Sequence, residues 1–151
     1  MNNYITESKV EAYFQSLDLT FNDNNNVCKI PVITTSNYII LGQFTALRFL
    51  EWVSLNPNGV VALPTGKTPE FFIKWVLYYL EHWDEECDHG ILKEIGINCK
   101  KPAFDGLHLF QQDEFFPINP EHERSFSYFI KNFYIKAFGF EPQKTHSNQI
   151  H

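Results

Sequence analysis

Two short segments of the sequence carry residues suited to binding and transforming a small ligand, and the first runs from Leu63 to Pro69. Gly66 allows the backbone to turn with its amides directed inward, and Thr65 and Thr68 add hydroxyl donors. Lys67 adds a positive charge. Because a helix is expected to start here, its dipole and free N–H groups favour an anion such as phosphate. A tight turn in which Thr68 caps the helix explains the same residues without a ligand.

The second segment is Gln111–Phe115, which contains the neighbouring acids Asp113 and Glu114. A carboxylate held between apolar walls such as Phe110 and Phe115 could act as a general base towards a carbon-bound proton. We therefore predict that Asp113 meets the sugar end of a ligand whose phosphate rests on the first segment, and that Glu114 orients the loop. An Asp that merely caps the exit from a strand is the alternative.

Both segments follow short apolar runs that predict strands. Val60–Leu63 is unbroken and apolar, which is typical of a strand buried on both faces of a parallel sheet. Leu107–Phe110 predicts a second strand. Between them Thr68 and Pro69 precede an apolar helix over 71–83, and after them a helical stripe over 126–138 ends at Gly139.

The order of strands and helices predicts an α/β fold, a three-layer, doubly wound and mostly parallel sheet of Rossmann-like type, in which ligands bind beyond the carboxyl ends of the strands. Two helices are predicted before the first strand, over Thr6–Leu17 and Ser36–Leu55, with the Asn22–Asn26 loop between them. The 151 residues are enough for one domain.

Composition narrows the class of protein. Twelve basic against 18 acidic residues give a net charge of −6, and no basic stripe is visible, so we expect no nucleic-acid partner and no anionic membrane surface. No apolar run reaches the length of a membrane span. Cys28, Cys87 and Cys99 form no C-x-x-C pair, which favours reduced thiols and a cytoplasmic location.

Metal binding is a weaker hypothesis. His82, Cys87, His89 and Cys99 lie within eighteen residues, but their spacing matches no common zinc pattern, so we expect surface or packed side chains and no metal. His108, inside the second predicted strand, is expected to be a hydrogen-bonded core residue.

The two segments together resemble the glucosamine-6-phosphate deaminase/isomerase family. The resemblance runs from Gly59 to Phe138 and includes Ser125-Phe126 on a helix. In that family the first segment reads Leu-Pro-Thr-Gly, a small residue and Thr-Pro, so Lys67 departs from it. The second usually reads Asn-Met-Asp-Glu-Tyr or Asn-Leu-Asp-Glu-Tyr. Its acids match Asp113 and Glu114, whereas Gln111, Gln112 and Phe115 differ.

The resemblance implies an amino-sugar-phosphate deaminase/isomerase that converts glucosamine 6-phosphate to fructose 6-phosphate and ammonia without a cofactor. It implies that Asp113 moves a proton between C2 and C1, and that Thr65, Gly66 and Thr68 cradle the phosphate. We add Lys67 and Glu114 to the expected substrate site.

The family's ring-opening segment, Asn-Asp-Gly-His followed by a Glu, has no counterpart before His151. Residues 1–151 are therefore expected to be the N-terminal portion of a deaminase-like domain, an incomplete domain whose activity alone is doubtful. Its partners would be a sugar phosphate and either a complementary C-terminal half or a second copy in a homo-oligomer. A 6-phosphogluconolactonase-like hydrolase and a non-catalytic sugar-phosphate-sensing module are the alternatives.

Overall fold

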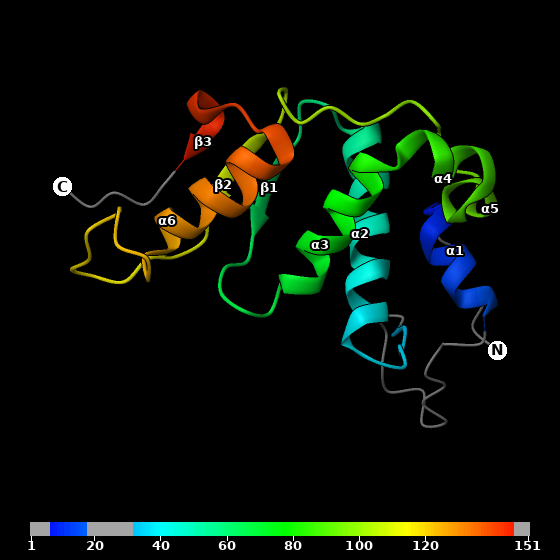
Figure 1. Cartoon of the computed structure of the whole chain (residues 1–151), viewed down its shortest axis with the longest axis horizontal. Helices are drawn as coiled ribbons and strands as arrows, with labels where there is room; N and C mark the ends of the chain where they lie inside the picture. Colours follow the sequence, from blue (N-terminus) through cyan, green and yellow to red (C-terminus); the bar gives the residue numbers. More distant parts are fainter. Residues whose placement is uncertain (1–6, 18–31, 147–151) are drawn as a thin grey trace.

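The computed structural model describes residues 7–17 and 32–146, and the predicted Asn22–Asn26 loop lies outside them. Figure 1 shows the helices gathered beside and in front of a small sheet. The elements, in chain order, are α1 Lys9–Ser16, α2 Tyr38–Leu55, β1 Val60–Leu63, α3 Glu70–Glu81, α4 Trp83–His89, α5 Ile91–Ile95, β2 His108–Gln111, α6 Phe126–Ile130, the π-helix η1 Lys131–Gly139, the 3₁₀ turn η2 Pro142–Lys144 and β3 Thr145–His146.

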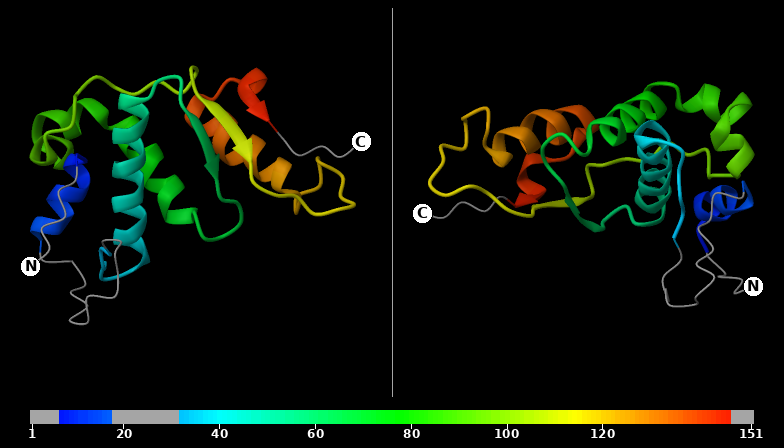
Figure 2. Two further views of the ribbon diagram at one scale, coloured as in Figure 1. Left: turned by 180° about the vertical axis from the view of Figure 1, so that it is seen from behind. Right: turned by 90° about the horizontal axis from the view of Figure 1, so that it is seen from below.

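The sheet confirms the predicted parallel α/β arrangement. Its order is β1-β2-β3, and both pairings are parallel. Strand β2 begins at His108, one residue later than predicted, and Leu63 of β1 is in register with Gln111 of β2. Because the strands run the same way, the loops that follow β1 and β2 leave the sheet at the same end (Figure 2).

The two faces of the sheet differ in burial. Leu63 and Leu109 are buried on the face covered by helices, whereas Val60 and Phe110 are 63% and 42% exposed on the other. Ala62 is exposed on that second face too. The expectation that the first strand is buried on both faces is therefore wrong for the described residues. In the described residues, helices cover the apolar strand β1 on one side only. We call the uncovered side, with Val60 and Ala62 of β1 and Phe110 of β2, the open face.

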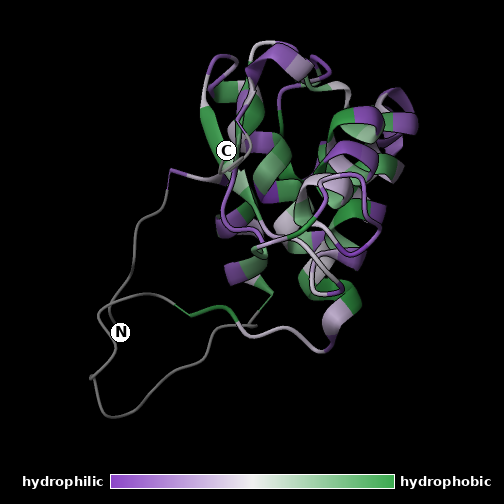
Figure 3. Ribbon diagram, turned by 90° about the vertical axis from the view of Figure 1, so that its left-hand side faces the viewer, coloured by the Kyte–Doolittle hydropathy of each residue, from purple (hydrophilic) through white to green (hydrophobic). Residues whose placement is uncertain are grey.

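A cluster of aromatic rings holds the helices to the sheet. The Phe49 ring of α2 lies 5.4 Å from Phe72 of α3, 5.9 Å from Phe104 and 6.4 Å from Phe138 of η1, measured between centroids. These spacings suit edge-to-face and tilted packing of aromatic side chains. Figure 3 shows hydrophobic and hydrophilic residues alternating along the helices, as expected of elements with one buried face.

Helix α1 is shorter than the predicted Thr6–Leu17 because its N-cap is Ser8, whose hydroxyl accepts a hydrogen bond from the N–H of Glu11. The Ser8 hydroxyl also donates to the carboxylate of Glu51 at 2.5 Å, and the N–H of Lys9 donates to the same carboxylate at 2.7 Å. Glu51 lies on α2 and is only 6% exposed. This buried carboxylate therefore fixes the start of α1 against α2.

The predicted helix over 126–138 is present, but its second part is a π-helix. Ser125 caps its start by accepting the N–H of Tyr128, and Gly139 ends it at a φ of 82°. The π-helical turns were not predicted, because the apolar residues recur at intervals of three and four, which is the α-helical pattern, and π-helices are rare.

Among the described residues, no helix combines the length and the apolar character needed to cross a bilayer.

The close contact of α2 with α3 gives a stability prediction at Gly42. A Cβ at this position would lie 2.6 Å from the Cβ of Phe71 and 2.8 Å from its carbonyl carbon, so Gly42→Ala must push the helices apart. We expect a loss of roughly 1–3 kcal/mol in the free energy of unfolding, although Gly to Ala in a helix is normally stabilising.

Chemical denaturation measures this loss, and Thr45→Ala on the exposed side of α2 is the control, expected to change stability by less than about 0.5 kcal/mol. A Gly42→Ala protein more stable than the parent would contradict the packing.

Candidate functional site

The loop after β1 turns sharply at Gly66. Gly66 adopts a φ of +85°, and a Cβ added there would meet no atom within 4 Å. The glycine is therefore needed for its conformation and not for space. Gly66, Lys67 and Thr68 are exposed and Thr65 is half-buried. The hydroxyl of Tyr134 on η1 donates to the carbonyl of Pro64 at 2.6 Å and ties the start of this loop to the helical layer.

The predicted capping role of Thr68 is wrong. Helix α3 begins at Glu70 with Pro69 as its N-cap residue, and no side chain caps it. The N–H of Glu70 instead donates to the carbonyl of Lys67 at 3.2 Å, so a turn precedes the helix and moves its start beyond the hydroxyl of Thr68. The Thr68 hydroxyl therefore does not cap α3.

Charged side chains flank the loop. Glu70 pairs with Lys74 at 2.6 Å, and the Lys74 ammonium, with a smaller effect from Lys67, holds the pKa of Glu70 below its usual value. The negative charge of Glu70 at the start of α3 is thus neutralised by Lys74. Lys67 remains an exposed positive charge beside Gly66.

The loop after β2 is organised by the carboxylate of Glu114. It accepts hydrogen bonds from the N–H of Phe126 at 3.0 Å, the N–H of Ser127 at 2.9 Å and the hydroxyl of Ser125 at 2.7 Å. Gln111 donates to it through Nε2 at 3.2 Å. This arrangement, which we call the Glu114 clamp, binds the end of β2 to the N-terminus of α6.

The clamp keeps Glu114 ionised. Partial burial by itself would raise the pKa of this carboxyl, but the hydrogen bonds from Ser127, Phe126 and Ser125, together with the N–H of Phe115, lower it to about 2. A carboxylate that accepts several N–H bonds is stabilised in its charged form. Glu114 therefore serves as a fixed negative charge and not as a group that gains and loses a proton near neutral pH.

Gln111, Ser125 and Ser127 complete this network, and sequence reasoning assigned them no such role. Gln111 is 4% exposed and Ser125 is 1% exposed. Ser127 donates to the Oε1 of Gln111 at 2.8 Å, while the Nε2 of Gln111 donates to the carbonyl of Asp113 at 2.7 Å. The available signal was Ser125 directly before the apolar stripe that starts at Phe126, because Ser is a preferred N-cap residue.

Asp113 lies two residues beyond Gln111, as Thr65 lies two residues beyond Leu63, and these two strand residues are register partners. Its carbonyl is held by Gln111 while its side chain is exposed. The expected apolar walls do not enclose it. Phe110 belongs to the open face, and Phe115 is 58% exposed with its ring against Phe126 at 4.8 Å.

His82, Cys87, His89 and Cys99, which are all described, do not gather into a metal site. Among the described residues, no group of three or more His, Cys, Asp or Glu side chains could hold a metal ion. Burial and the neighbouring Cys99 raise the pKa of Cys87 to about 12, which disfavours the thiolate that metals bind.

His108 is half-buried, so the expectation that it lies in the core is wrong. It is hydrogen-bonded as expected, since its Nδ1 lies 3.3 Å from the Nε2 of His146 across the β2–β3 pair. Their ring planes are 8° apart and their centroids 5.6 Å apart. The two rings are therefore nearly parallel, and one N–H···N contact joins them, with the donor set by the tautomers.

Comparison with solved structures places this fold in a known class. The chain superposes on a structure described as a monomeric glucosamine-6-phosphate deaminase and a missing link of the NagB superfamily, with a TM-score of 0.60 and 17% identity. The likeness covers 78% of this chain and 43% of that chain. It shows that this chain shares the fold of that structure over the region compared.

Sequence comparison gives the particular relatives. The chain is 26% identical over 117 residues to proteins named glucosamine-6-phosphate deaminase from Halothermothrix orenii and Clostridium tetani, which covers 76% and 77% of this chain. No family model matches it. The chain is thus similar in sequence to proteins named glucosamine-6-phosphate deaminase, in agreement with the resemblance of its motifs, and it spans 41% of the length of these relatives.

The Glu114 clamp generates a prediction on stability and its pH dependence. Glu114→Gln replaces an acceptor oxygen by an amide that faces N–H donors, so we expect a loss of roughly 1–3 kcal/mol in the free energy of unfolding at pH 7. Because the folded pKa is lower than the value of about 4.3 for an unfolded Glu, the carboxylate stabilises the fold above pH 4. This contribution disappears as the pH falls from about 4 to about 2.

Denaturation curves of the parent and variant between pH 7 and pH 2 measure the difference, which should narrow as the acid limit is approached. Glu121→Gln is the matched control, since Glu121 is 69% exposed at its side chain and pairs only with Lys131 among the described residues. Equal losses in the two variants would show that the clamp does not hold the loop.

Proposed function

We propose that this chain carries the phosphate-binding and proton-transferring part of an amino-sugar-phosphate deaminase/isomerase, which converts glucosamine 6-phosphate and water to fructose 6-phosphate and ammonia. The single observation that supports it is the register of Leu63 with Gln111, which brings the Thr65–Thr68 loop and Asp113 to the same end of adjacent parallel strands. Neighbouring strands lie about 4.8 Å apart. One hexose phosphate can span two loops at that separation.

The phosphate end of the substrate would rest on the loop after β1. The left-handed φ of Gly66 makes a sharp turn whose amides would face the phosphate, and the exposed hydroxyl of Thr68 does not cap α3. Thr65 adds a second hydroxyl, and Lys67 adds a positive charge, because the ion partner of Glu70 is Lys74. The N-terminus of α3, a helix of 12 residues, strengthens the preference for an anion.

Asp113 would be the acid/base. Its carboxylate would remove the proton from C2 of the open-chain amino sugar, which gives an enediol-like enolamine intermediate, and would then return a proton to C1. The product of this transfer is the C2 imine of fructose 6-phosphate, and water would hydrolyse it to the ketone and release ammonia. Glu114 is not proposed as the acid/base, because its carboxylate accepts hydrogen bonds from N–H and O–H groups that keep it ionised. Its role is to position Asp113 through the backbone of the loop.

The Asp113–Glu114 pair favours a deaminase over a lactonase, since lactone hydrolysis needs no proton transfer between carbons. A sensing role would leave Asp113 without chemistry to perform. The residues that open the sugar ring in the resembled family have no counterpart in the two segments, so the proposal for this chain concerns binding and the C2–C1 proton transfer.

Replacement of Asp113 tests the proposed base. Solvent deuterium incorporation into fructose 6-phosphate is the appropriate assay, because this exchange needs the base alone and neither ammonia nor ring-opening groups. We expect Asp113→Asn to lower the exchange rate by roughly a hundredfold or more, with little change in the affinity for the sugar phosphate.

Asp105→Asn is the matched control, an exposed Asp just before β2, at its other end, and it should exchange at the parent rate. Full exchange by Asp113→Asn would remove Asp113 from the mechanism, and no exchange by the parent chain would refute catalysis by these residues.

Replacement of Thr68 separates ligand binding from folding. Because Thr68 does not cap α3, Thr68→Val should weaken glucosamine 6-phosphate binding by roughly tenfold, equivalent to one lost hydrogen bond to a charged group, with a stability change under about 0.5 kcal/mol. Titration calorimetry and thermal melts give the two quantities. A Thr68→Val protein that binds as the parent does but melts earlier would contradict this assignment.

A further inference from the structure

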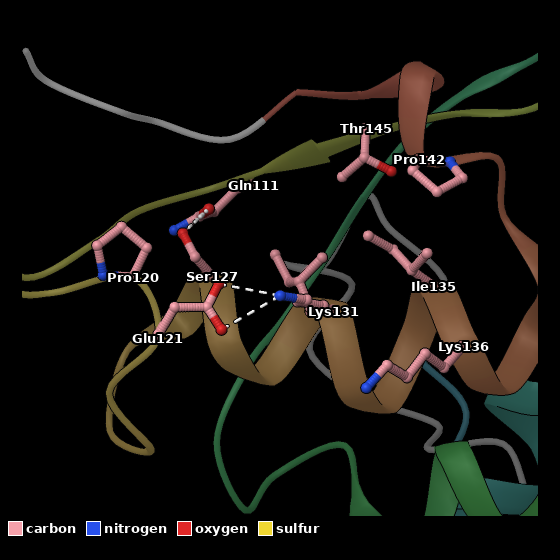
Figure 4. A pocket seen from close by; sticks show the side chains of 10 residues that line it. Gln111, Pro120, Glu121, Ser127, Lys131, Ile135, Lys136, Pro142 and Thr145 are labelled. Carbon is pink, nitrogen blue, oxygen red and sulfur yellow. Dashed lines mark hydrogen bonds and ion pairs between the residues drawn. The ribbon is translucent and has the colours of Figure 1, made fainter.

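A hollow of about 360 Å³ lies between the strands β2 and β3 and the α6–η1 helix, and Figure 4 shows the side chains around it. Lys131 is paired there with Glu121 at 2.9 Å, and Ser127 donates to Gln111 at 2.8 Å. These polar groups are engaged with one another, so they serve the fold rather than a ligand. Two thiols outside the candidate site have a more definite chemistry.

The thiols of Cys87 and Cys99 lie next to each other, although the residues are twelve positions apart in the chain. Their side chains are hydrogen-bonded to one another, and the Sγ of Cys99 also lies 4.0 Å from the carbonyl oxygen of Cys87. Cys87 belongs to α4, whereas Cys99 lies in the segment that follows α5. Figure 1 shows α4 and α5 beside α1, with α2 and α3 between them and the sheet. The pair is therefore remote from the candidate site.

Hydrogen bonds anchor the segment that brings Cys99 to α4. The indole Nε1 of Trp83, at the start of α4, donates to the carbonyl of Cys99 at 2.9 Å, and Trp83 is fully buried. Gly96 ends α5 at a φ of 74°, and the N–H of Ile97 then donates to a carbonyl of α5 at 3.1 Å. Cys99 is exposed and Cys87 is half-buried, and both thiols are free in the structure. A reagent in solution therefore reaches Cys99 first.

We propose that Cys87 and Cys99 form a redox-active dithiol, which a small-molecule disulfide oxidises to an intramolecular cross-link between α4 and the segment after α5. The Cys99 thiolate attacks one sulfur of the reagent, which forms a mixed disulfide and releases one thiolate. The Cys87 thiolate then attacks the Sγ of Cys99, so the Sγ–Sγ bond forms and the second thiolate leaves. The two thiol protons end on the two released thiolates, and the protein gives two electrons to the reagent.

The surroundings of Cys87 make the cross-link slow to reduce. Burial, the hydrogen bond with Cys99 and the charges of Asp84 and Asp88 raise the pKa of Cys87 to about 12. In the mixed disulfide the Cys99 thiol is gone, but burial and the two Asp charges remain. A reductant that attacks the exposed sulfur of Cys99 must therefore expel a thiolate of raised pKa, and such thiolates leave slowly.

The cross-link closes a ring of residues 87–99, which includes the surface where α1 packs on α5. The ammonium of Lys9 donates to the carbonyl of Gly96. The hydroxyl of Tyr13 donates to the carboxylate of Glu94 at 3.1 Å. Because a disulfide restricts the unfolded chain more than the folded one, oxidation stabilises this end of the molecule.

Oxidation of the folded 151-residue chain with oxidised glutathione tests the proposal. Cys28→Ser is introduced first, so that Cys87 and Cys99 are the two cysteines that remain. We expect the loss of both thiols, with no glutathione bound at completion and no dimer on a non-reducing gel. Glutathione that persists on either cysteine, or a dimer linked through them, would overturn the proposal.

Peptide mapping locates the bond. Trypsin cleaves after Lys74, Lys93 and Lys100, so the two cysteines fall in the separate peptides 75–93 and 94–100. Mass spectrometry of the oxidised chain should find these peptides joined, and reduction should separate them. Two unlinked peptides from a chain that has lost its thiols would overturn the proposal.

Glutathione redox buffers measure how far the fold favours the bond. We expect the equilibrium constant for cross-linking to be at least roughly tenfold larger for the folded chain than for the chain in concentrated urea, because only the fold holds the thiols in contact. Equal constants would show that the fold does not bring them together.

Thermal melts measure the effect on stability. The oxidised chain should melt roughly 5 °C above the reduced chain. Cys99→Ser is the matched control at the exposed position, and the same treatment should move its midpoint by less than about 2 °C. A lower midpoint for the oxidised chain would show that the fold must distort to form the bond, and would overturn the proposal. These measurements use no sugar phosphate, so their outcome is independent of the proposed function.

Discussion

The carboxylate of Glu114 is the interaction on which the candidate site depends. It accepts the hydroxyl of Ser125 and the N–H groups of Phe126 and Ser127, and so satisfies donors that a helix leaves without partners in its first turn. It also places a negative charge where the helix dipole is positive. One side chain thus determines both where the α6–η1 helix begins and how the chain leaves β2.

The clamp separates the duties of two adjacent acids. Glu114 is turned towards the helix and kept charged by hydrogen bonds, whereas Asp113 presents an exposed carboxylate from a backbone that Gln111 holds in place. A group that must accept and release a proton cannot also carry several structural hydrogen bonds, because each bond favours its ionised form. The neighbouring residue therefore carries the structural bonds.

Sequence reasoning predicted the parallel pairing of the two strands and the position of both loops, because apolar runs and glycine or proline punctuation are local signals. It misplaced the start of α3, since a backbone bond from Glu70 to Lys67 competes with the Thr68 hydroxyl and only the folded turn decides between them. It also missed the roles of Gln111 and Ser127 in the clamp. Their contact joins residues 16 apart, and polar residues at that distance give no periodic signal.

The burial of β1 is a second feature that sequence reasoning predicted wrongly. An unbroken apolar strand predicts cover on both faces, and the described residues supply it on one. The pattern in Val60–Leu63 is consistent with a larger assembly than the described part of the chain, because apolar side chains at alternate positions gain nothing from facing water. The aromatic cluster around Phe49 stabilises the covered face alone. Gln111 lies buried on the covered face of the sheet and holds the carbonyl of Asp113, so the geometry of the candidate base is determined from the helix-covered side of β2.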